Sequence, residues 1–333
     1  MVLLLAALFQ GAASSDARSM STEHTRDEGS GEPEAQFGLR LLEAPVVRRD
    51  DPRAYTSIVD HLNPGTTIQR RLEISNKSPD PLRIEVYAAA ASIEKRTFTF
   101  AAGRAHNELT EWTSVDHPVL RLAPDSKETV RVTIKVPPRA SRGERYGVVW
   151  AEVAGSGKGN VKVINRVGIR IYLDVGPGGE PPSAFRIEKL TPARSREGQP
   201  RITAQVRNTG ERALEMSGKL RLSEGPAGLR AGPYPVTRGT TLAPGDTGSV
   251  SVALDGRLPN GPWKARLTLV SGRVQETVTA TVTFPSAGMR GSSVVPDFAQ
   301  RSSMLSWGLG VLLLILAVVG IRRLKRRLAR RRN

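Results

Sequence analysis

Short runs in which apolar and polar residues alternate extend over most of the chain and predict β-strands. Residues 71–75, 82–86 and 130–136 place an apolar side chain at every second position, so Leu72 and Ile74 are expected to face inwards. Pro, Gly, Asn and Asp interrupt these runs about every ten residues, which is typical of antiparallel sandwiches. The pattern therefore predicts an all-β protein.

A motif recurs along the chain and predicts two copies of one structural unit. Leu122-Ala-Pro precedes Val130 and Val132, and Leu242-Ala-Pro precedes valines at the same offsets, 120 residues later. A strand that ends at an asparagine lies upstream of each copy, at Asn76 and at Asn208. Two tandem immunoglobulin-like β-sandwich domains explain this best. Convergent use of Pro and Gly turns is the alternative.

Composition shifts along the chain give the domain boundaries. The first sandwich is predicted over residues 37–176 and the second over 184–285, separated by a Pro and Gly linker at 177–183. Residues 286–303 are rich in Gly and Ser and are expected to form a stalk.

The C-terminal part of the chain predicts a membrane anchor. Residues 304–321 carry no charge and match the shortest length that spans a bilayer, although a buried globular helix is the alternative. The tail at 322–333 is strongly basic and is expected to stay in the cytoplasm. The expected anchor residues are Trp307, which suits the headgroup region, and the cations Arg322, Arg323, Lys325, Arg326 and Arg327.

The N-terminal part predicts export. Residues 1–15 join an apolar run to small residues, as in a signal peptide, although no cation precedes the run and a short buried strand is the alternative. Residues 16–36 form an acidic, disordered leader. Together with the predicted span, these segments indicate a single-pass type I membrane protein whose N-terminal region lies outside the cell and whose tail contacts membrane lipids.

The inventory of reactive side chains argues against an enzyme. The chain has no Cys and four His, and it lacks the sequence motifs of common hydrolases and nucleotide-binding proteins. Ser57, Asp60 and His61 lie too close in sequence to converge as a catalytic triad. His106 and His117 belong to an irregular segment expected to be a solvated loop. We therefore predict no catalytic residue, no cofactor and no metal.

Charge points to an anionic partner. The chain holds 49 Lys and Arg against 32 Asp and Glu, and arginine suits carboxylate and phosphate groups. Trp150 is expected to pack in the core. For Trp112 two interpretations stay open: an exposed ring on which a ligand stacks, or a core residue. The candidate contacts for a polymer or partner are Arg70, Arg71, Trp112, Arg139, Arg142 and Arg145.

Several motifs in the first predicted domain resemble the WxL-interacting proteins, an extracellular family whose N-terminal module is called a peptidoglycan-binding domain. They include Asn63-Pro-Gly65, the Ala88–Ser92 run, Leu122-Ala-Pro-Asp-Ser-Lys127, Pro137-Pro138 and Tyr146-Gly-Val-Val149. The similarity covers residues 37–176, and the second domain matches the family only in its placement. The family's Gly-Gly pair stands here as Tyr146-Gly147. The resemblance implies peptidoglycan binding and supplies no catalytic residues.

These features predict a non-enzymatic, membrane-anchored cell-surface protein. Its expected partners are cell-wall peptidoglycan or another anionic wall polymer, and a secreted surface protein, with no nucleic acid. One competing hypothesis is a donor-strand or chaperone-like ectodomain for a secreted client, in which an open sheet edge pairs with a partner strand. A membrane-anchored hydrolase is a second, and a structural stalk or signalling ectodomain without a ligand is a third.

Overall fold

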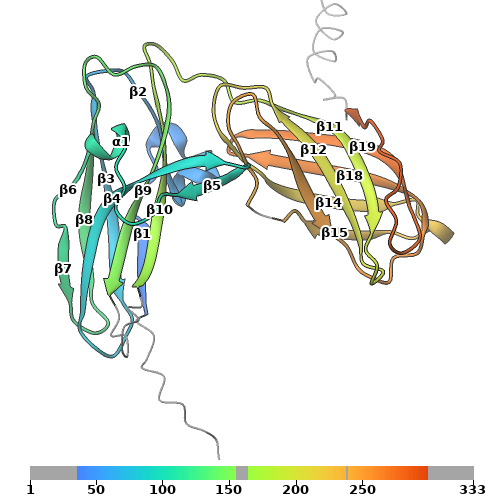
Figure 1. The fold of residues 1–333 in the computed structure, drawn as a ribbon, viewed down its shortest axis with the longest axis horizontal. Helices are drawn as coiled ribbons and strands as arrows, with labels where there is room; N and C mark the ends of the chain where they lie inside the picture. The colour runs from blue at the N-terminus through green and yellow to red at the C-terminus, as the bar shows by residue number, and fades with distance from the viewer. Residues whose placement is uncertain (1–35, 155–163, 238, 299–333) are drawn as a thin grey trace, which may run out of the picture. The chain divides into compact units, whose positions relative to one another are not determined.

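A computed structural model describes residues 36–154, 164–237 and 239–298. All of these residues belong to one compact unit that begins at Ala35. The described chain is all-β, as predicted, and its strands form two sandwiches (Figure 1). The predicted signal peptide, nearly all of the leader, the membrane span and the basic tail lie outside the described residues. No helix in the described ranges is long and apolar enough to cross a membrane.

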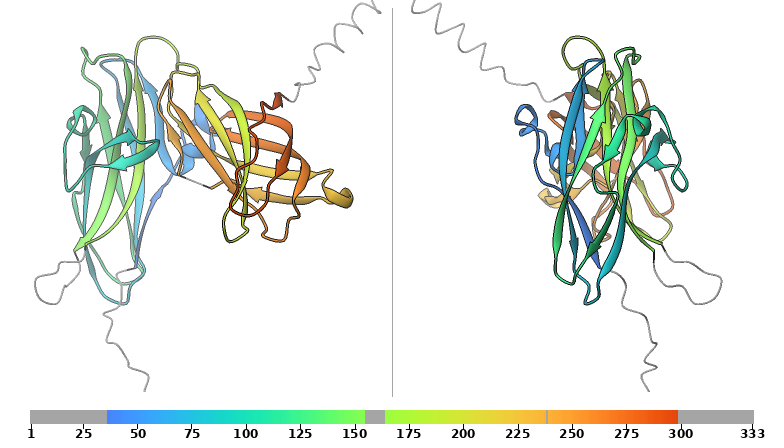
Figure 2. Two further views of the ribbon diagram at one scale, coloured as in Figure 1. Left: turned by 45° about the vertical axis from the view of Figure 1, so that its right-hand side comes forward. Right: turned by 90° about the vertical axis from the view of Figure 1, so that its left-hand side faces the viewer.

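The first sandwich contains two sheets that lie face to face (Figure 2). Their inward side chains share one core. One sheet has the order β1-β3-β8-β6, and the other has the order β2-β10-β9-β4-β5 with β7 also paired to β4. Alternation along the strands turns Leu72, Ile74, Ile84 and Val86 into this core, as predicted. The strands are β1 (Phe37–Leu41), β2 (Ser57–Leu62), β3 (Thr67–Asn76), β4 (Leu82–Glu94), β5 (Thr97–Phe100), β6 (Thr113–Val115), β7 (Val119–Leu122), β8 (Lys127–Lys135), β9 (Gly143–Ala154) and β10 (Ile164–Val175).

Short helical turns connect some of these strands. The helix α1 (Glu108–Glu111) begins at Asn107, whose side chain accepts the N–H of Thr110 at 3.0 Å. It interrupts the segment predicted to be irregular. The 3₁₀ turns η1 (Val46–Arg48) and η2 (Pro52–Tyr55) join β1 to β2.

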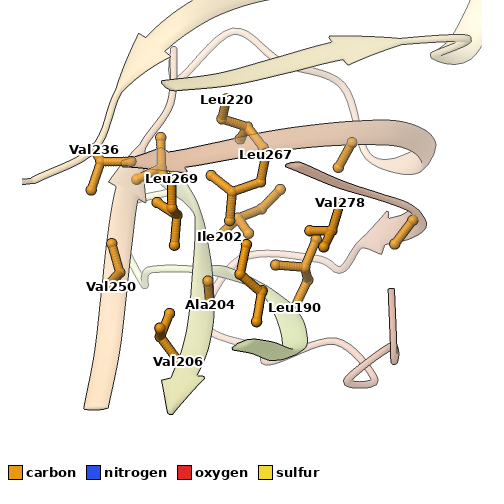
Figure 3. Close-up of a cluster of buried hydrophobic side chains, with 14 of the residues drawn as sticks. Leu190, Ile202, Ala204, Val206, Leu220, Val236, Val250, Leu267, Leu269 and Val278 are labelled. Atoms are coloured by element: carbon orange, nitrogen blue, oxygen red, sulfur yellow. The ribbon is translucent and has the colours of Figure 1, made fainter. Parts of the chain in front are cut away.

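The second sandwich follows the same plan with its own core. Its sheets have the orders β11-β12-β17 and β15-β14-β18-β19-β20, with a separate β13-β16 pair. Figure 3 shows aliphatic side chains such as Leu190, Ile202 and Leu267 meeting between the sheets. The elements are β11 (Phe185–Arg194), β12 (Pro200–Asn208), β13 (Leu214–Glu215), β14 (Ser217–Ser223), η3 (Pro226–Gly228), β15 (Ala231–Pro235), β16 (Thr241–Leu242), β17 (Thr247–Ala253), β18 (Gly261–Ser271), β19 (Val274–Phe284) and β20 (Asp297–Phe298).

The repeated motif forms the same hydrogen bonds in both sandwiches. The Nδ2 of Asn76 donates to the carbonyls of Leu122 and Ala123, each at 3.1 Å. The Nδ2 of Asn208 donates to the equivalent carbonyls of the second Leu-Ala-Pro, again at 3.1 Å. Each asparagine also donates to a carbonyl four residues downstream at 2.8 Å. The predicted repeat is therefore a shared hydrogen-bonded turn.

Residues 286–298, which we call the edge segment, do not form the predicted stalk. The backbone of Val294 exchanges two hydrogen bonds of 2.8 Å with Leu190 of β11, and β20 pairs with β19. Figure 1 shows this segment running beside β11 and β19. The prediction was wrong because a Gly and Ser composition does not reveal that a chain can fold back onto free backbone groups. Residues 299–303 of that predicted stalk lie outside the described ranges.

Candidate functional site

Two of the predicted contact arginines form ion pairs on the first sandwich. Arg70 donates to Asp60 at 2.6 Å, and its side chain is only 14% exposed. Burial raises the pKa of Asp60, and the neighbouring positive charge of Arg70 acts in the opposite direction. Arg71 donates to both carboxylate oxygens of Glu43, at 3.1 and 2.8 Å. Both guanidinium groups therefore already have an anionic partner.

The other predicted contact residues differ in whether they already have an ion-pair partner. Arg142 pairs with Glu211 at 3.0 Å. Arg145 pairs with Glu108 at 2.7 Å and stacks 4.8 Å from the ring centre of Trp112, which packs against the core. Arg139 forms no ion pair with another described residue. Polymer contact by these side chains stays a prediction, and the anchor residues Trp307, Arg322, Arg323, Lys325, Arg326 and Arg327 lie outside the described ranges.

The histidines do not assemble a catalytic centre in the described ranges. His61 Nδ1 lies 2.6 Å from Asp174 of β10, and its Nε2 lies 3.1 Å from the carbonyl oxygen of Gly178. The neighbouring Asp60 binds Arg70 instead. His117 is exposed and lies 3.2 Å from Asp116. No group of three potential metal-ligating residues occurs among the described side chains.

The buried cation Arg212 is fully paired. Its Nε donates to Glu144 at 2.8 Å, and both side chains are almost completely buried. A second guanidinium nitrogen bonds Glu180, which also pairs with Arg48 at 2.8 Å. Removing one partner from such a network leaves a buried charge uncompensated, so we assign the network a structural role.

The free backbone of β10 is the first feature that points to a ligand. Residues Arg170–Val175 are paired on both sides, with β9 and in parallel with β2. Residues Ile164–Ile169 pair with β9 alone among the described strands. We call these six residues the free half of β10. Half of its N–H and C=O groups therefore face away from the sheet without a strand partner.

Aromatic and arginine side chains lie on the outer face of the same sheet. Trp150 of β9 stacks edge-on against Phe100 at 4.8 Å, and Arg166 lies 5.8 Å from the Trp150 ring. The expected core position of Trp150 was wrong, because its neighbours Val149 and Ala151 take the inward positions. A Cβ on Gly168 would lie 2.6 Å from two ring carbons of Trp150. Glycine therefore lets the indole lie across β10.

A hydrogen-bonded network continues this outer face. Tyr87 donates to Glu152, and Arg104 lies 4.1 Å above the tyrosine ring. Burial, followed by the hydrogen bond and negative charge of Glu152, raises the pKa of Tyr87 to about 12. Glu152 also lies 3.3 Å from Arg166. Glu152 therefore joins Tyr87 and Arg166 in one network on this face.

Sequence patterns could not separate the free half of β10 from its paired half. The alternation in Arg166–Val175 predicts a strand. Which residues of this strand gain a second partner depends on where β2 lies in the folded sheet, and the local pattern does not contain that information. One sequence signal could have placed Trp150 on the outer face: in an alternating strand, its neighbours Val149 and Ala151 take the inward positions.

Comparisons with known proteins give similarity only at the level of structure. No family model matches the chain, and no curated protein matches it. The chain is similar to the crystal structure of the E. coli chaperone DraB, with 13% identity, a TM-score of 0.37, and coverage of 79% of this chain and 98% of that one. It is also similar to a structure of the Salmonella enterica SafA pilin in complex with the SafB chaperone, with 11% identity, a TM-score of 0.38, and coverage of 80% and 96%.

A third similar structure is the CsuC–CsuE chaperone–tip adhesion subunit complex of Acinetobacter baumannii. The identity is 12%, the TM-score is 0.37, and the match covers 74% of this chain and 98% of that one. At TM-scores this low, the similarities say nothing about what this chain binds.

Proposed function

We propose that this chain is a non-enzymatic protein-binding module that takes up an extended segment of a partner along the free half of β10. The observation that carries the proposal is the contrast within one strand: among the described strands, residues 170–175 have two partners and residues 164–169 have one. An unpaired strand edge offers a row of donors and acceptors that an extended peptide satisfies.

The side chains beside this edge fit a strand partner. Val167 and Ile169 point towards the core, while Arg166 and Gly168 lie on the outer face next to Trp150. A segment added beside β10 would present its residues alternately to these two environments. We therefore expect the partner segment to alternate apolar residues towards the core with aromatic or small residues over Trp150.

The free half of β10 lacks three common protections of a sheet edge. Lysine side chains, prolines and bulges commonly block edge pairing. The free half contains no proline, its pairing with β9 is regular, and its one charged residue, Arg166, is neutralised by Glu152. This arrangement favours strand addition over the wall-polymer hypothesis, because four of the five predicted contact arginines already bind carboxylates.

A site-specific crosslinking experiment tests this function. A photo-reactive amino acid replaces Ile164, which is 41% exposed on the free half, or Val119, which is 45% exposed on β7. The two variants are made in the cells that produce the protein. We expect a partner to be captured at position 164 and not at 119, through an extended segment. Equal capture at both positions would contradict the proposal.

The purified partner then permits a quantitative test. Ile164→Lys places a charge on the strand edge and should weaken binding at least about 10-fold, because edge lysines oppose pairing with a further strand. The matched Val119→Lys variant should bind as the unaltered chain does. Hydrogen exchange of the complex should protect amides in residues 164–169. Unchanged exchange at those amides would place the partner elsewhere and contradict the hypothesis that a partner strand pairs with the free half of β10.

A further inference from the structure

A groove on the outer face of the second sandwich is strongly basic. It occupies about 810 Å³ across β15, β14, β18 and β19. Leu220, Leu222 and Leu267 of these strands fill the core, so the residues between them point outwards. The groove is lined by the cations Lys219, Arg221, Arg230 and Arg266, and Glu224 is the one acid among its described lining residues.

The arginine pair at the centre of the groove is unbalanced. Arg221 and Arg266 lie directly opposite each other on β14 and β18. Like charges in this position destabilise a sheet. Neither guanidinium group forms an ion pair or hydrogen bond with another residue in the described ranges.

Three more pairs of arginines lie opposite each other in the described strands, and in these pairs a glutamate offsets the repulsion. They are Arg71 with Arg131, Arg83 with Arg121, and Arg186 with Arg207. In each of them one arginine binds a glutamate, namely Glu43, Glu85 or Glu188. The pair in the groove is the exception among these four.

The remaining groups around the groove do not supply the missing negative charge. Glu224 already binds Lys264 at 2.8 Å. Lys219 and Arg230 form no ion pair with another described residue, so they add two further positive charges. Among the described residues, four cations thus line one groove without a carboxylate of their own, and an anionic ligand would remove their mutual repulsion.

The geometry selects the kind of anion. Neighbouring strands lie about 4.8 Å apart, so the cations of β14 and β18 and the one directly before β15 are spread over about 10 Å. A chain of closely spaced anions gives each cation its own anionic group, which a single phosphate or carboxylate does not. Arginine forks bind phosphate oxygens through paired hydrogen bonds, and the hydroxyl groups of Thr268 and Thr277 also line the groove.

We propose that this groove binds a linear phosphate polymer. A recessed groove suits a chain that lies within it better than it suits the flat surface of an anionic bilayer. The site lies on β14 and β18 of the second sandwich, so it does not depend on strand addition at β10.

The test measures binding of inorganic polyphosphate to the full chain in a non-ionic detergent, by isothermal titration calorimetry at several salt concentrations. The test variant is Arg221→Gln/Arg266→Gln. The matched control, Arg83→Gln/Arg121→Gln, removes the same charge from an opposed pair on the first sandwich. Thermal unfolding checks both variants, and the groove variant should remain folded because the change relieves repulsion.

We expect polyphosphate binding to weaken at least about 10-fold in the groove variant and less than about 2-fold in the control, since a charge-assisted hydrogen bond contributes over 1.4 kcal/mol. The slope of log affinity against log salt should fall in magnitude by about 1.4 when two phosphate contacts are lost. Arg221→Lys/Arg266→Lys should retain the salt slope and lose part of the affinity.

Two results would overturn the proposal. Equal weakening in the groove and control variants would show non-specific attraction to a basic protein. Binding of monomeric dihexanoyl phosphatidylglycerol, but not of polyphosphate, with loss in the groove variant would assign the groove to lipid headgroups. Orthophosphate is the reference ligand and should bind far more weakly than polyphosphate.

Discussion

The two sandwiches share one plan but treat the edge of their last long strand differently. In the first, the free half of β10 has no second strand partner among the described residues. In the second, residues 290 and 294 of the edge segment bridge to β11, and its last residues, in β20, pair with β19. After β10 the chain leaves through the Pro and Gly linker, whereas after β19 it folds back. Edge closure therefore depends on the path of the chain and not on the strands themselves.

The two sandwiches also differ in whether their exposed cations are paired with acidic side chains. The predicted contact arginines of the first sandwich are mostly bound to acids, whereas the groove cations of the second are not. The first sandwich thus offers backbone groups and the second offers charge. We therefore propose two different ligand chemistries for one repeated architecture.

Removing the edge segment should have the largest effect. A chain that ends at residue 285 loses five backbone hydrogen bonds of 2.8–2.9 Å, which involve Leu190, Pro192, Arg194 and Ser195. At about 1 kcal/mol each, this loss should destabilise the second sandwich by about 5 kcal/mol. A chain that ends at residue 298 retains them and is the control.

Urea unfolding measures this difference. With Trp112 and Trp150 replaced by Phe in both truncated chains, the buried Trp263 reports on the second sandwich alone. Identical midpoints for the two lengths would show that the edge segment contributes no stability.

The repeated asparagines provide a matched pair of substitutions. Asn76→Ala and Asn208→Ala each remove three side-chain hydrogen bonds to backbone carbonyls. Each change should lower the free energy of unfolding of its own sandwich by about 2–3 kcal/mol. The exposed Asn63 is the control, and its replacement by Ala should cost less than about 0.5 kcal/mol. Strongly unequal losses would argue against equivalent roles.

Native-state hydrogen exchange compares the two edges directly. The amides of Leu190 and Arg194 donate to the edge segment and should exchange slowly. The amides of the free half of β10 that point away from β9 should exchange at least about 100-fold faster. NMR exchange spectra of the full chain would measure both sets. Slow exchange throughout residues 164–169 would mean that the free half is covered in solution.

The smallest effect concerns the alkaline stability of the first sandwich. Since the pKa of Tyr87 is raised to about 12, folding favours its protonated form. The resulting stability is complete below about pH 10, the pKa of an unfolded tyrosine, and is lost as the pH rises to about 12. Replacing Glu152 by Gln should lower the pKa of Tyr87. Absorbance at 295 nm, with a Tyr87→Phe chain as the reference, would detect this, and an unchanged titration would remove Glu152 as a cause.

Local patterns predicted much of the architecture but little of the candidate sites. Alternation placed Leu72 and Ile74 in the core, because a strand's side chains alternate whatever its neighbours are. The recurrence of Asn76 and Asn208 revealed the repeat, because one asparagine must meet the same carbonyls in each copy. The acidic partners of Arg70 and Arg71 lie elsewhere along the chain, so charge counts could not show that these cations are occupied.

The order of apolar, polar and turn residues was thus sufficient to establish that the chain forms strands and repeats a sandwich, since those properties arise within a few residues. Which edge is closed, and which arginines lack a carboxylate, depended on contacts between residues distant in sequence. Val294 returns to Leu190, and Arg221 meets Arg266, only after the sheets have assembled. Strand pairing in three dimensions decides those contacts because each backbone group and each charge responds to its spatial neighbours.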